Sequence, residues 1–324
     1  MRFWLASFFF SSCLCAAEPL RGHAADVAAF TVSGVSSGGY MAVQMHVAYS
    51  SRVVGAAALA AGPYYCARGS LWSAWNQCMT GAPAPTRSDA ERFAREKRID
   101  PLANLGAARV WLFSGTEDRT VVPRVVEALA GQYALFGAKP VLIADKPAGH
   151  AMVTEEAGAA CAATEPPFIN DCDYDAAGEL LRHLLGPLLS PSSRRDGQLL
   201  SFDQREFGAT QAASMAQAGF VYLPTACRDG KCRVHVAFHG CRQNADAVGE
   251  RFVREAGYNR WADTNHLIVL YPQTVARTVG WPFNPRGCWD WWGYTGPAYA
   301  TKEGPQMRAV LAMVERLGLQ RKER

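Results

Sequence analysis

The feature that most constrains this chain is a serine placed between two glycines, where one apolar segment gives way to another. Gly34, Ser36 and Gly38 form the pattern G-x-S-x-G, which is typical of a strand that turns sharply into a helix and exposes one serine hydroxyl. Residues 25–32 are apolar and of strand length, and residues 40–49 contain Ala, Met and Val without Gly or Pro. The bare motif also occurs in glycine-rich loops without chemical roles. These flanking segments favour a nucleophile over such a loop.

Segments of strand and helix character alternate after this turn. Residues 53–61, 109–115 and 140–144 are apolar runs of strand length, and residues 121–136 carry apolar side chains at helical spacing. Such alternation indicates a mostly parallel sheet with helices on both faces. An apolar fraction of 49% with 19% charged residues is ordinary for a globular protein. The sequence therefore predicts an α/β fold.

The rest of the chain extends this pattern. Further helices are predicted at residues 89–97, 176–185, 245–265 and 307–319. We expect the strands at residues 220–224 and 232–240 to form a hairpin around residues 228–230, and another strand at residues 267–272. The short Pro- and Ser-containing patch at residues 187–193 does not indicate a domain boundary.

The N-terminus has the pattern of a secretory signal peptide. Arg2 precedes an apolar run at residues 3–14, and small residues follow up to Ala17, where we expect cleavage. The apolar run is short for a membrane span. We therefore expect residues 1–17 to be removed and residues 18–324 to form one exported domain, extracellular or periplasmic, without membrane attachment.

Export bears on the oxidation state expected for the cysteines. The chain has ten, and these eight follow the predicted cleavage site: Cys66, Cys78, Cys161, Cys172, Cys227, Cys232, Cys241 and Cys288. An even number in an oxidising compartment favours disulfides, and no C-x-x-C pair points to a metal. We expect neither metal nor cofactor. The net charge of +4 is small and its Lys and Arg residues are scattered, so we expect no nucleic-acid partner.

A serine nucleophile needs a base, and the base needs an orienting carboxylate. In α/β-hydrolases the acid and then the histidine follow the serine along the chain. Asp118 comes directly after the strand at residues 109–115, with Glu117 as the alternative, and His150 lies on a loop after the next strand. Three other histidines lie in predicted helices or out of this order: His46, His183 and His266. Ser36, Asp118 and His150 are the predicted triad.

The second half of an oxyanion hole is out of its usual place. In this fold a backbone N–H after the nucleophile acts with one from a His-Gly loop that precedes the serine. Here the His-Gly pair that follows an apolar strand is His239-Gly240, far downstream of His150. If this loop serves, the chain has a circularly permuted α/β-hydrolase fold, which is feasible because the ends of compact domains commonly lie close together.

Four segments together resemble the catalytic domain of secreted polyhydroxybutyrate depolymerases with a permuted fold and an early serine. They read GVSSGGYMAVQMHVAYS, AAGPYYCARG, FHGCRQ and GCWDWWGYTG. The resemblance implies hydrolysis of poly(3-hydroxybutyrate) or its oligomers through an acyl-enzyme on Ser36. It implies that Asp118 and His150 complete the triad and that Ser37 and Cys241 supply the oxyanion N–H groups. Many relatives append a polymer-adsorbing domain, but this chain ends soon after residue 319, and we expect no separate polymer-binding domain.

Aromatic residues near the C-terminus suggest where a polyester lies. Four tryptophans crowd a Pro- and Gly-punctuated segment: Trp281, Trp289, Trp291 and Trp292. Flat apolar rings suit an aliphatic polyester, so we expect substrate contacts from these residues, although at least one should belong to the core. The expected partner is a polyester or oligoester bound by a monomer.

Eight cysteines allow roughly a hundred pairings, so spacing only suggests a choice. We propose these four pairs: Cys66–Cys78, Cys161–Cys172, Cys227–Cys232 and Cys241–Cys288. The last would tie the oxyanion loop to the tryptophan-rich segment.

Two alternative functions remain open at this point. A secreted feruloyl or acetyl esterase would share the triad, the export signal and the disulfides. A non-catalytic binding module on a hydrolase scaffold belongs to another class, and labelling of Ser36 by a fluorophosphonate would separate it from an enzyme.

Overall fold

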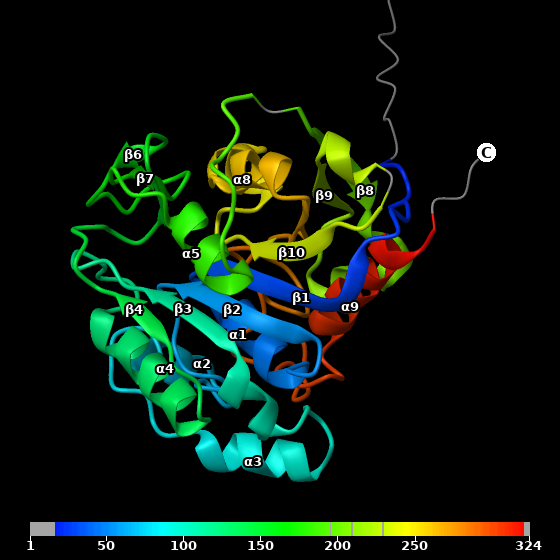
Figure 1. Cartoon of the computed structure of the whole chain (residues 1–324). Helices are drawn as coiled ribbons and strands as arrows, with labels where there is room; N and C mark the ends of the chain where they lie inside the picture. The colour runs from blue at the N-terminus through cyan, green and yellow to red at the C-terminus, as the bar shows by residue number, and fades with distance from the viewer. Residues whose placement is uncertain (1–16, 195, 209, 229, 321–324) are drawn as a thin grey trace, which may run out of the picture.

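A computed structural model describes residues 17–194, 196–208, 210–228 and 230–320. The predicted signal peptide therefore lies outside the described residues except for Ala17. An eight-stranded sheet crosses the molecule in the order β4-β3-β2-β1-β10-β11-β9-β8 (Figure 1). Its strands are β1 (Asp26–Val35), β2 (Val53–Leu59), β3 (Arg109–Phe113), β4 (Val141–Ile143), β8 (Gln198–Asp203), β9 (Ala218–Leu223), β10 (Arg233–Phe238) and β11 (Leu267–Tyr271).

The sheet is mostly parallel, as predicted. The strands from β4 through β1 to β11 run parallel to their neighbours, whereas β9 and β8 pair antiparallel at one edge. The central strands β1, β2, β10 and β11 are buried over most of their length because helices cover both of their faces. The side chains of β1 from Phe30 to Val35 are all buried.

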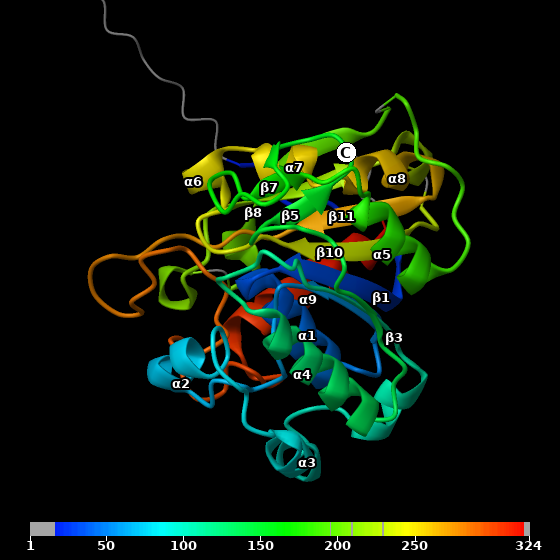
Figure 2. The same ribbon diagram turned by 90° about the vertical axis from the view of Figure 1, so that its left-hand side faces the viewer.

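Helices pack on both faces of the sheet, and each face has its own apolar core. Figures 1 and 2 show α1 and α4 on one face and α5 and α8 on the other. The helices are α1 (Ser37–Ala48), α2 (Leu71–Asn76), α3 (Arg87–Arg95), α4 (Pro123–Leu135), α5 (Ala176–Leu185), α6 (Ala245–Val248), α7 (Arg251–Glu255), α8 (Tyr258–Thr264) and α9 (Pro305–Gly318). Among the described residues, none of the helices has both the length and the apolar character needed to cross a bilayer.

The strand order is that of a circularly permuted α/β-hydrolase fold. β10 leads to the His239-Gly240 pair. It lies directly beside β1 in the sheet, although about 200 residues separate the two strands in sequence. The two ends of the described chain also meet, because the backbone N–H of His23 donates to the carbonyl of Leu317 at 2.9 Å. Figure 1 shows the first and last segments side by side. This proximity makes the permutation possible without distorting the sheet.

Two secondary-structure predictions are wrong. β9 and β10 do not form a hairpin, because β11 lies between them in the sheet. The helix expected at residues 245–265 is three short helices, α6, α7 and α8. The breaks fall at Gly249 and Gly257, which adopt φ of 63° and 92°, a left-handed conformation that glycine enters without steric cost.

Other elements had no counterpart in the sequence analysis. The edge strand β8 and the short helix α2 were not expected. A second small sheet, in the order β5-β7-β6, comprises β5 (Met152–Thr154), β6 (Ala159–Ala160) and β7 (Ile169–Asp171).

The described residues form four disulfides, and these join the pairs proposed from the sequence: Cys66–Cys78, Cys161–Cys172, Cys227–Cys232 and Cys241–Cys288. Three of them close short local loops, whereas Cys241–Cys288 spans 47 residues. It is the disulfide that joins two distant loops near the carboxyl ends of the central strands.

We predict that Gly38→Ala destabilises the protein. A Cβ on Gly38 would lie 2.3 Å from the carbonyl oxygen of Phe238, so β1, α1 and β10 would have to separate. Overpacking of this kind costs about 1–3 kcal/mol or more. Gly131→Ala is the matched control, because nothing lies within 4 Å of its added Cβ in α4, and alanine stabilises an exposed helix position by about 0.5–1 kcal/mol. Chemical denaturation would measure both changes, and equal stability of the two variants would contradict the prediction.

Candidate active site

Ser36 occupies the sharp turn between β1 and α1. Its backbone adopts φ 57° and ψ −124°. Residues other than glycine rarely adopt this conformation, and they keep it only where the surrounding structure enforces it. The N–H of Ser36 donates to the carbonyl of Leu59 in β2 at 2.9 Å, and the carbonyl of Ser36 accepts the N–H of Tyr40 at 3.0 Å. The turn is thus anchored on both sides, and its side chain lines an open cleft.

The structure brings the three predicted triad residues together. The hydroxyl of Ser36 lies 2.8 Å from Nε2 of His150, and Nδ1 of His150 lies 2.8 Å from a carboxylate oxygen of Asp118. Asp118 follows β3 and His150 follows β4, so both reach the edge of the sheet at which β1 turns. With Nδ1–H donated to the carboxylate, Nε2 is left as the acceptor of the serine proton.

Asp118 is held independently of the histidine. Its second carboxylate oxygen accepts the backbone N–H groups of Thr120 at 2.8 Å and Val121 at 2.9 Å. The backbone N–H of His150 donates to the hydroxyl of Thr164 at 2.9 Å. Both side chains are buried, so the line from carboxylate to imidazole to hydroxyl is fixed before substrate arrives.

The oxyanion loop, residues 239–243, follows β10 and passes beside the serine. A Cβ on Gly240 would lie 3.4 Å from the Cβ of Ser36. The N–H of Gly240 is engaged by Oε1 of Gln243 at 2.7 Å, whereas no hydrogen bond among the described residues uses the N–H of Cys241. The N–H of Ser37 belongs to the first turn of α1, where helices have no internal acceptor. These two N–H groups are therefore available to an oxyanion.

Two contacts hold this loop in place. The Cys241–Cys288 disulfide links it to the segment that carries the tryptophans. His239 is buried, its Nδ1–H donates to the carbonyl of Gly240 at 2.7 Å, and its Nε2 accepts the N–H of Thr274 at 3.2 Å. Burial lowers the pKa of His239 to about 4, which keeps the imidazole neutral and preserves the acceptor at Nε2.

The triad opens into a cleft of about 510 Å³. Most of its walls are apolar or aromatic, from segments that lie far apart in the sequence: Val35, Tyr40, Leu71, Trp75, Met79, Val121, Phe168, Phe283, Trp291 and Trp292. Helix α2 forms one wall with Leu71 and Trp75. The sequence analysis missed this wall, although its Leu-Trp-x-x-Trp spacing is a signal of an amphipathic helical turn.

The four predicted tryptophans separate into three environments. Trp291 and Trp292 line the cleft, and Trp291 stacks on Tyr40 with a centroid distance of 4.4 Å. Trp281 is 70% exposed and lies outside the cleft lining. Trp289 is 0% exposed and packs edge-on against Phe238. The expectation of a substrate contact is therefore corrected for Trp289, which belongs to the core.

A buried carboxylate shapes the tryptophan-containing wall. Asp290 accepts the backbone N–H groups of Gly293, Tyr294 and Thr295 at 2.7–3.0 Å and the hydroxyl of Thr295 at 2.6 Å. Its burial raises the pKa of the carboxyl above its ordinary value. The bonds of Asp290 fold the chain back on itself directly after Trp291 and Trp292, which fixes the position of both rings.

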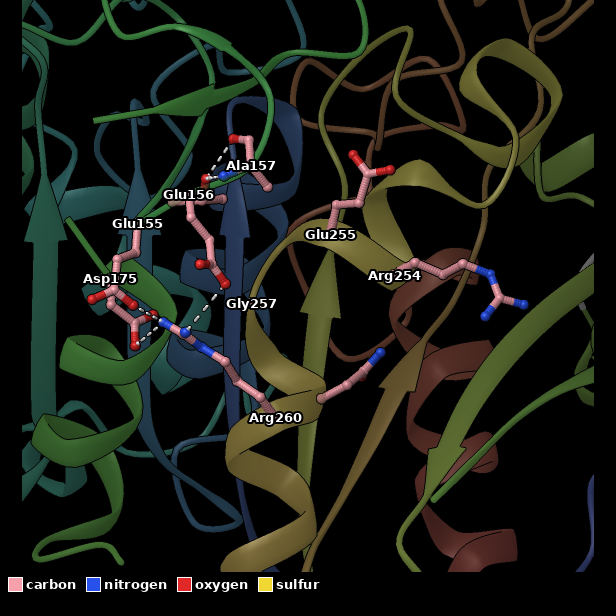
Figure 3. Close-up of a pocket in the computed structure, with 10 residues that line it drawn as sticks. Glu155, Glu156, Ala157, Asp175, Arg254, Glu255, Gly257 and Arg260 are labelled. Atoms are coloured by element: carbon pink, nitrogen blue, oxygen red, sulfur yellow. Dashed lines mark hydrogen bonds and ion pairs between the residues drawn. The ribbon is translucent and has the colours of Figure 1, made fainter. Parts of the chain in front are cut away.

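A second hollow shares no lining residue with this cleft and is drawn in Figure 3. It measures about 70 Å³, and Figure 3 shows Arg260 pointing toward the carboxylates of Glu155 and Asp175. Arg260 pairs with these groups at 2.5 and 2.7 Å. The hollow is thus occupied by an ion-pair network that ties α8 to the segment before α5. Within the described part of the chain, no group of three or more His, Cys, Asp or Glu side chains is placed to hold a metal ion.

The large cleft has the parts required for acyl transfer. A serine, a base and an orienting acid stand in line, two N–H groups near the serine have no acceptor among the described residues, and most of the cleft wall is apolar. In a low-dielectric setting, such preorganised donors stabilise a developing oxyanion by several kcal/mol.

Comparison with known proteins identifies similar chains. Residues 10–173 match the model of the prolyl oligopeptidase family. A poly(3-hydroxybutyrate) depolymerase of Delftia acidovorans is 45% identical over 299 residues, which cover 89% of this chain but 59% of that protein. A polyhydroxybutyrate depolymerase of Talaromyces funiculosus is 37% identical over 305 residues, which cover 89% of this chain and 88% of that protein. The chain therefore spans less than two thirds of the first relative and most of the second.

Two solved structures are also similar to this chain. The crystal structure of a PHB depolymerase from Penicillium funiculosum has a TM-score of 0.87 and 33% identity, and the match covers 93% of this chain and 100% of that one. A PHB depolymerase carrying a serine-to-alanine substitution, complexed with an R3HB trimer, has a TM-score of 0.87 and 34% identity with the same coverage.

We predict that Ser36→Ala lowers ester turnover by several orders of magnitude, leaving the residual rate that binding and the oxyanion donors supply. Ser37→Ala should cost far less, because Ser37 offers a backbone N–H that survives the change. Its hydroxyl accepts the N–H of Trp289 at 3.3 Å, so a small loss of stability is expected. Hydrolysis of p-nitrophenyl butyrate would measure both variants. If Ser37→Ala were inactive and Ser36→Ala active, the assignment of Ser36 as the nucleophile would be wrong.

We predict that the free energy of unfolding falls as the pH is lowered from 6.5 to 4. Burial lowers the pKa of His46 and His235 to about 3 and that of His239 to about 4, from 6.5. Between pH 6.5 and 4 the unfolded chain therefore binds more protons than the folded one, and the free energy of unfolding decreases as pH decreases.

Denaturation titrations at several pH values would test this. His46→Asn can keep a partner for the hydroxyl of Tyr133, which lies 2.8 Å from Nδ1 of His46, while removing one titrating group. Its stability should decline less steeply through the window, by up to about 1.4 kcal/mol per pH unit. Parallel curves for this variant and the parent protein would contradict the prediction.

Proposed function

The chain belongs to the polyhydroxybutyrate depolymerase family, and from this premise we propose that it is a serine esterase that hydrolyses poly(3-hydroxybutyrate) or its oligomers. The observation that carries the proposal is the line from Asp118 through His150 to Ser36, with both contacts at 2.8 Å, at the floor of an apolar cleft. An aliphatic polyester presents methyl and methylene groups between evenly spaced ester carbonyls, which fits such walls.

In the proposed reaction, His150 removes the hydroxyl proton of Ser36 as the oxygen attacks an ester carbonyl. The N–H groups of Ser37 and Cys241 stabilise the oxyanion of the tetrahedral intermediate. His150 then gives its proton to the departing alkoxide, leaving an acyl-enzyme on Ser36. A water molecule, deprotonated by His150, releases the acid and restores the serine. Asp118 keeps the imidazole in the required tautomer throughout.

We propose that the protein acts outside the cytoplasm, extracellular or periplasmic, after loss of residues 1–17. The support is the N-terminal sequence pattern together with four disulfides, because disulfides persist in oxidising compartments. We further propose that residues 18–324 act as a monomer with one catalytic domain. The continuous eight-stranded sheet supports the single domain.

Esterases of the feruloyl or acetyl type are the second candidate. Aromatic walls would also accept a feruloyl ring, and Trp75 and Trp292 both line the cleft. Product analysis after incubation with amorphous polyhydroxybutyrate separates the two, because only a depolymerase releases hydroxybutyrate units. A feruloyl ester cleaved faster than a hydroxybutyrate trimer would replace the proposal with this alternative.

We predict that Trp75→Ala lowers kcat/KM for a hydroxybutyrate trimer roughly tenfold, the factor that corresponds to about 1.4 kcal/mol of binding. Remote contacts can be used to position the scissile ester, so a short p-nitrophenyl ester that does not reach α2 should be affected much less. Trp75 is 46% exposed, so its replacement should leave the fold intact.

Trp72→Ala provides the matched control from the same helix. Trp72 is 65% exposed and is not among the residues that line the cleft. Its loss should leave the trimer rate unchanged. Equal losses for Trp72→Ala and Trp75→Ala, or equal losses on trimer and p-nitrophenyl ester, would show that the cleft wall formed by α2 does not bind the chain.

A further inference from the structure

Two arginines stand side by side at the rim of the cleft. Arg242 follows Cys241 in the oxyanion loop, and Arg286 lies two residues before Cys288. The backbone N–H of Arg242 donates to the carbonyl of Arg286 at 2.7 Å, directly beside the disulfide that joins the two loops. Both side chains are exposed and both line the cleft.

Neither guanidinium pairs with a carboxylate of the described residues. Most arginines of the described chain pair with a carboxylate, but Arg242 and Arg286 take part in no ion pair among the residues that the structure describes. The guanidinium of Arg286 lies over the ring of Trp75 at 5.6 Å, an arrangement that holds it against the cleft wall. Arg242 adopts φ 57°, which is costly for a residue with a Cβ. Two positive charges are therefore available to a ligand.

The loop that carries Arg242 contacts the segment that supports His150. Nε2 of Gln243, the neighbour of Arg242, donates to the carbonyl of Phe168 at 2.8 Å. Thr164, four residues earlier, accepts the N–H of His150 at 2.9 Å. The oxyanion loop thus meets, next to Arg242, the segment that supports His150. Because His150 protonates the departing oxygen, the leaving half of the substrate lies on this side of the serine.

The leaving half of an oligoester has a distinctive end. When Ser36 attacks a chain of hydroxybutyrate units, the acyl half ends in a hydroxyl group and the departing half ends in a free carboxylate. Guanidinium groups bind carboxylates through charge-assisted hydrogen bonds, often in a two-pronged arrangement. A mostly apolar cleft that is lined by two unpaired arginines, with Arg242 in the loop that meets the segment supporting His150, matches such an end.

We propose that Arg242 and Arg286 bind the free terminal carboxylate of an oligoester, so that the enzyme favours cleavage of short units from the carboxyl end of a chain. This inference rests on the proposed function. It makes the two arginines specificity residues for chain ends and soluble oligomers, where internal esters of a long polymer offer no charge.

One group opposes this preference. Glu165 is exposed and lines the same cleft, and its carboxylate repels the charge that the arginines attract. The local balance is two positive side chains against one negative. Removal of Glu165 should therefore act in the direction opposite to removal of the arginines, which gives the experiment an internal check.

Two hydroxybutyrate trimers test the proposal, one ending in a free carboxylate and one in a primary carboxamide. Their ester bonds are the same, and only the terminal charge differs. At low ionic strength the parent enzyme should give a kcat/KM for the acid about three- to tenfold above that for the amide, the range expected for exposed to partly desolvated charge pairs. Added salt should shrink this ratio, because exposed charges are screened.

Variants locate the effect. Arg242→Gln/Arg286→Gln should lower the acid-to-amide ratio to one or below, because Glu165 remains, mainly through a higher KM for the acid, whereas Glu165→Gln should raise the ratio. The charge-matched control is Arg95→Gln/Arg308→Gln, which removes two exposed arginines outside the cleft and should leave the parent ratio.

The outcomes separate this proposal from the function on which it rests. Cleavage of neither trimer by the parent enzyme would overturn the proposed function and this inference with it. Cleavage of both, with the same ratio in the parent and in Arg242→Gln/Arg286→Gln, would overturn the carboxylate site alone. A ratio that falls equally in the Arg95→Gln/Arg308→Gln control would assign the effect to net charge and would also overturn it.

Discussion

The turn at Ser36 is the constraint on which the rest of the structure depends. Ser36 alone connects the end of β1 to the start of α1, and it does so in a rarely populated backbone conformation. The turn is tight because Gly38 packs directly on the backbone of Phe238 at the end of β10. The acid and the base arrive from the ends of β3 and β4. Every reactive group therefore lies at the carboxyl edge of one parallel sheet, where open α/β sheets bind ligands.

Much of the site could be predicted because its signals are local. The G-x-S-x-G pattern is complete within five residues, Asp118 comes directly after one predicted strand, and His150 lies on the loop after the next. The structure places these three in line. The four cysteine pairs also agree with their proposed partners, three of them because short spacing leaves few geometric choices.

What could not be predicted depends on non-local packing. The insertion of β11 between β9 and β10 leaves no trace in either strand, so the adjacency in sequence was taken for a hairpin. Trp289 and Trp291 are two residues apart, yet one is core and the other faces the cleft, because the bonds of Asp290 decide the path of the chain. Arg242 lies within the FHGCRQ segment and Arg286 just before GCWDWWGYTG, yet neither segment indicates that the two arginines act together. Their meaning comes only from the loops that bring them together.

The permuted strand order has a consequence for when the site comes into existence. Thr31 in β1 and His235 in β10 share a hydrogen bond although 204 residues separate them in sequence. During synthesis the serine is made early, whereas the loop that completes its surroundings is made late. Pairings of such long range are slow to form and wait for most of the chain. The nascent polypeptide therefore holds a nucleophile without its oxyanion partner, and catalytic competence arrives only when the last third of the chain has folded onto the first.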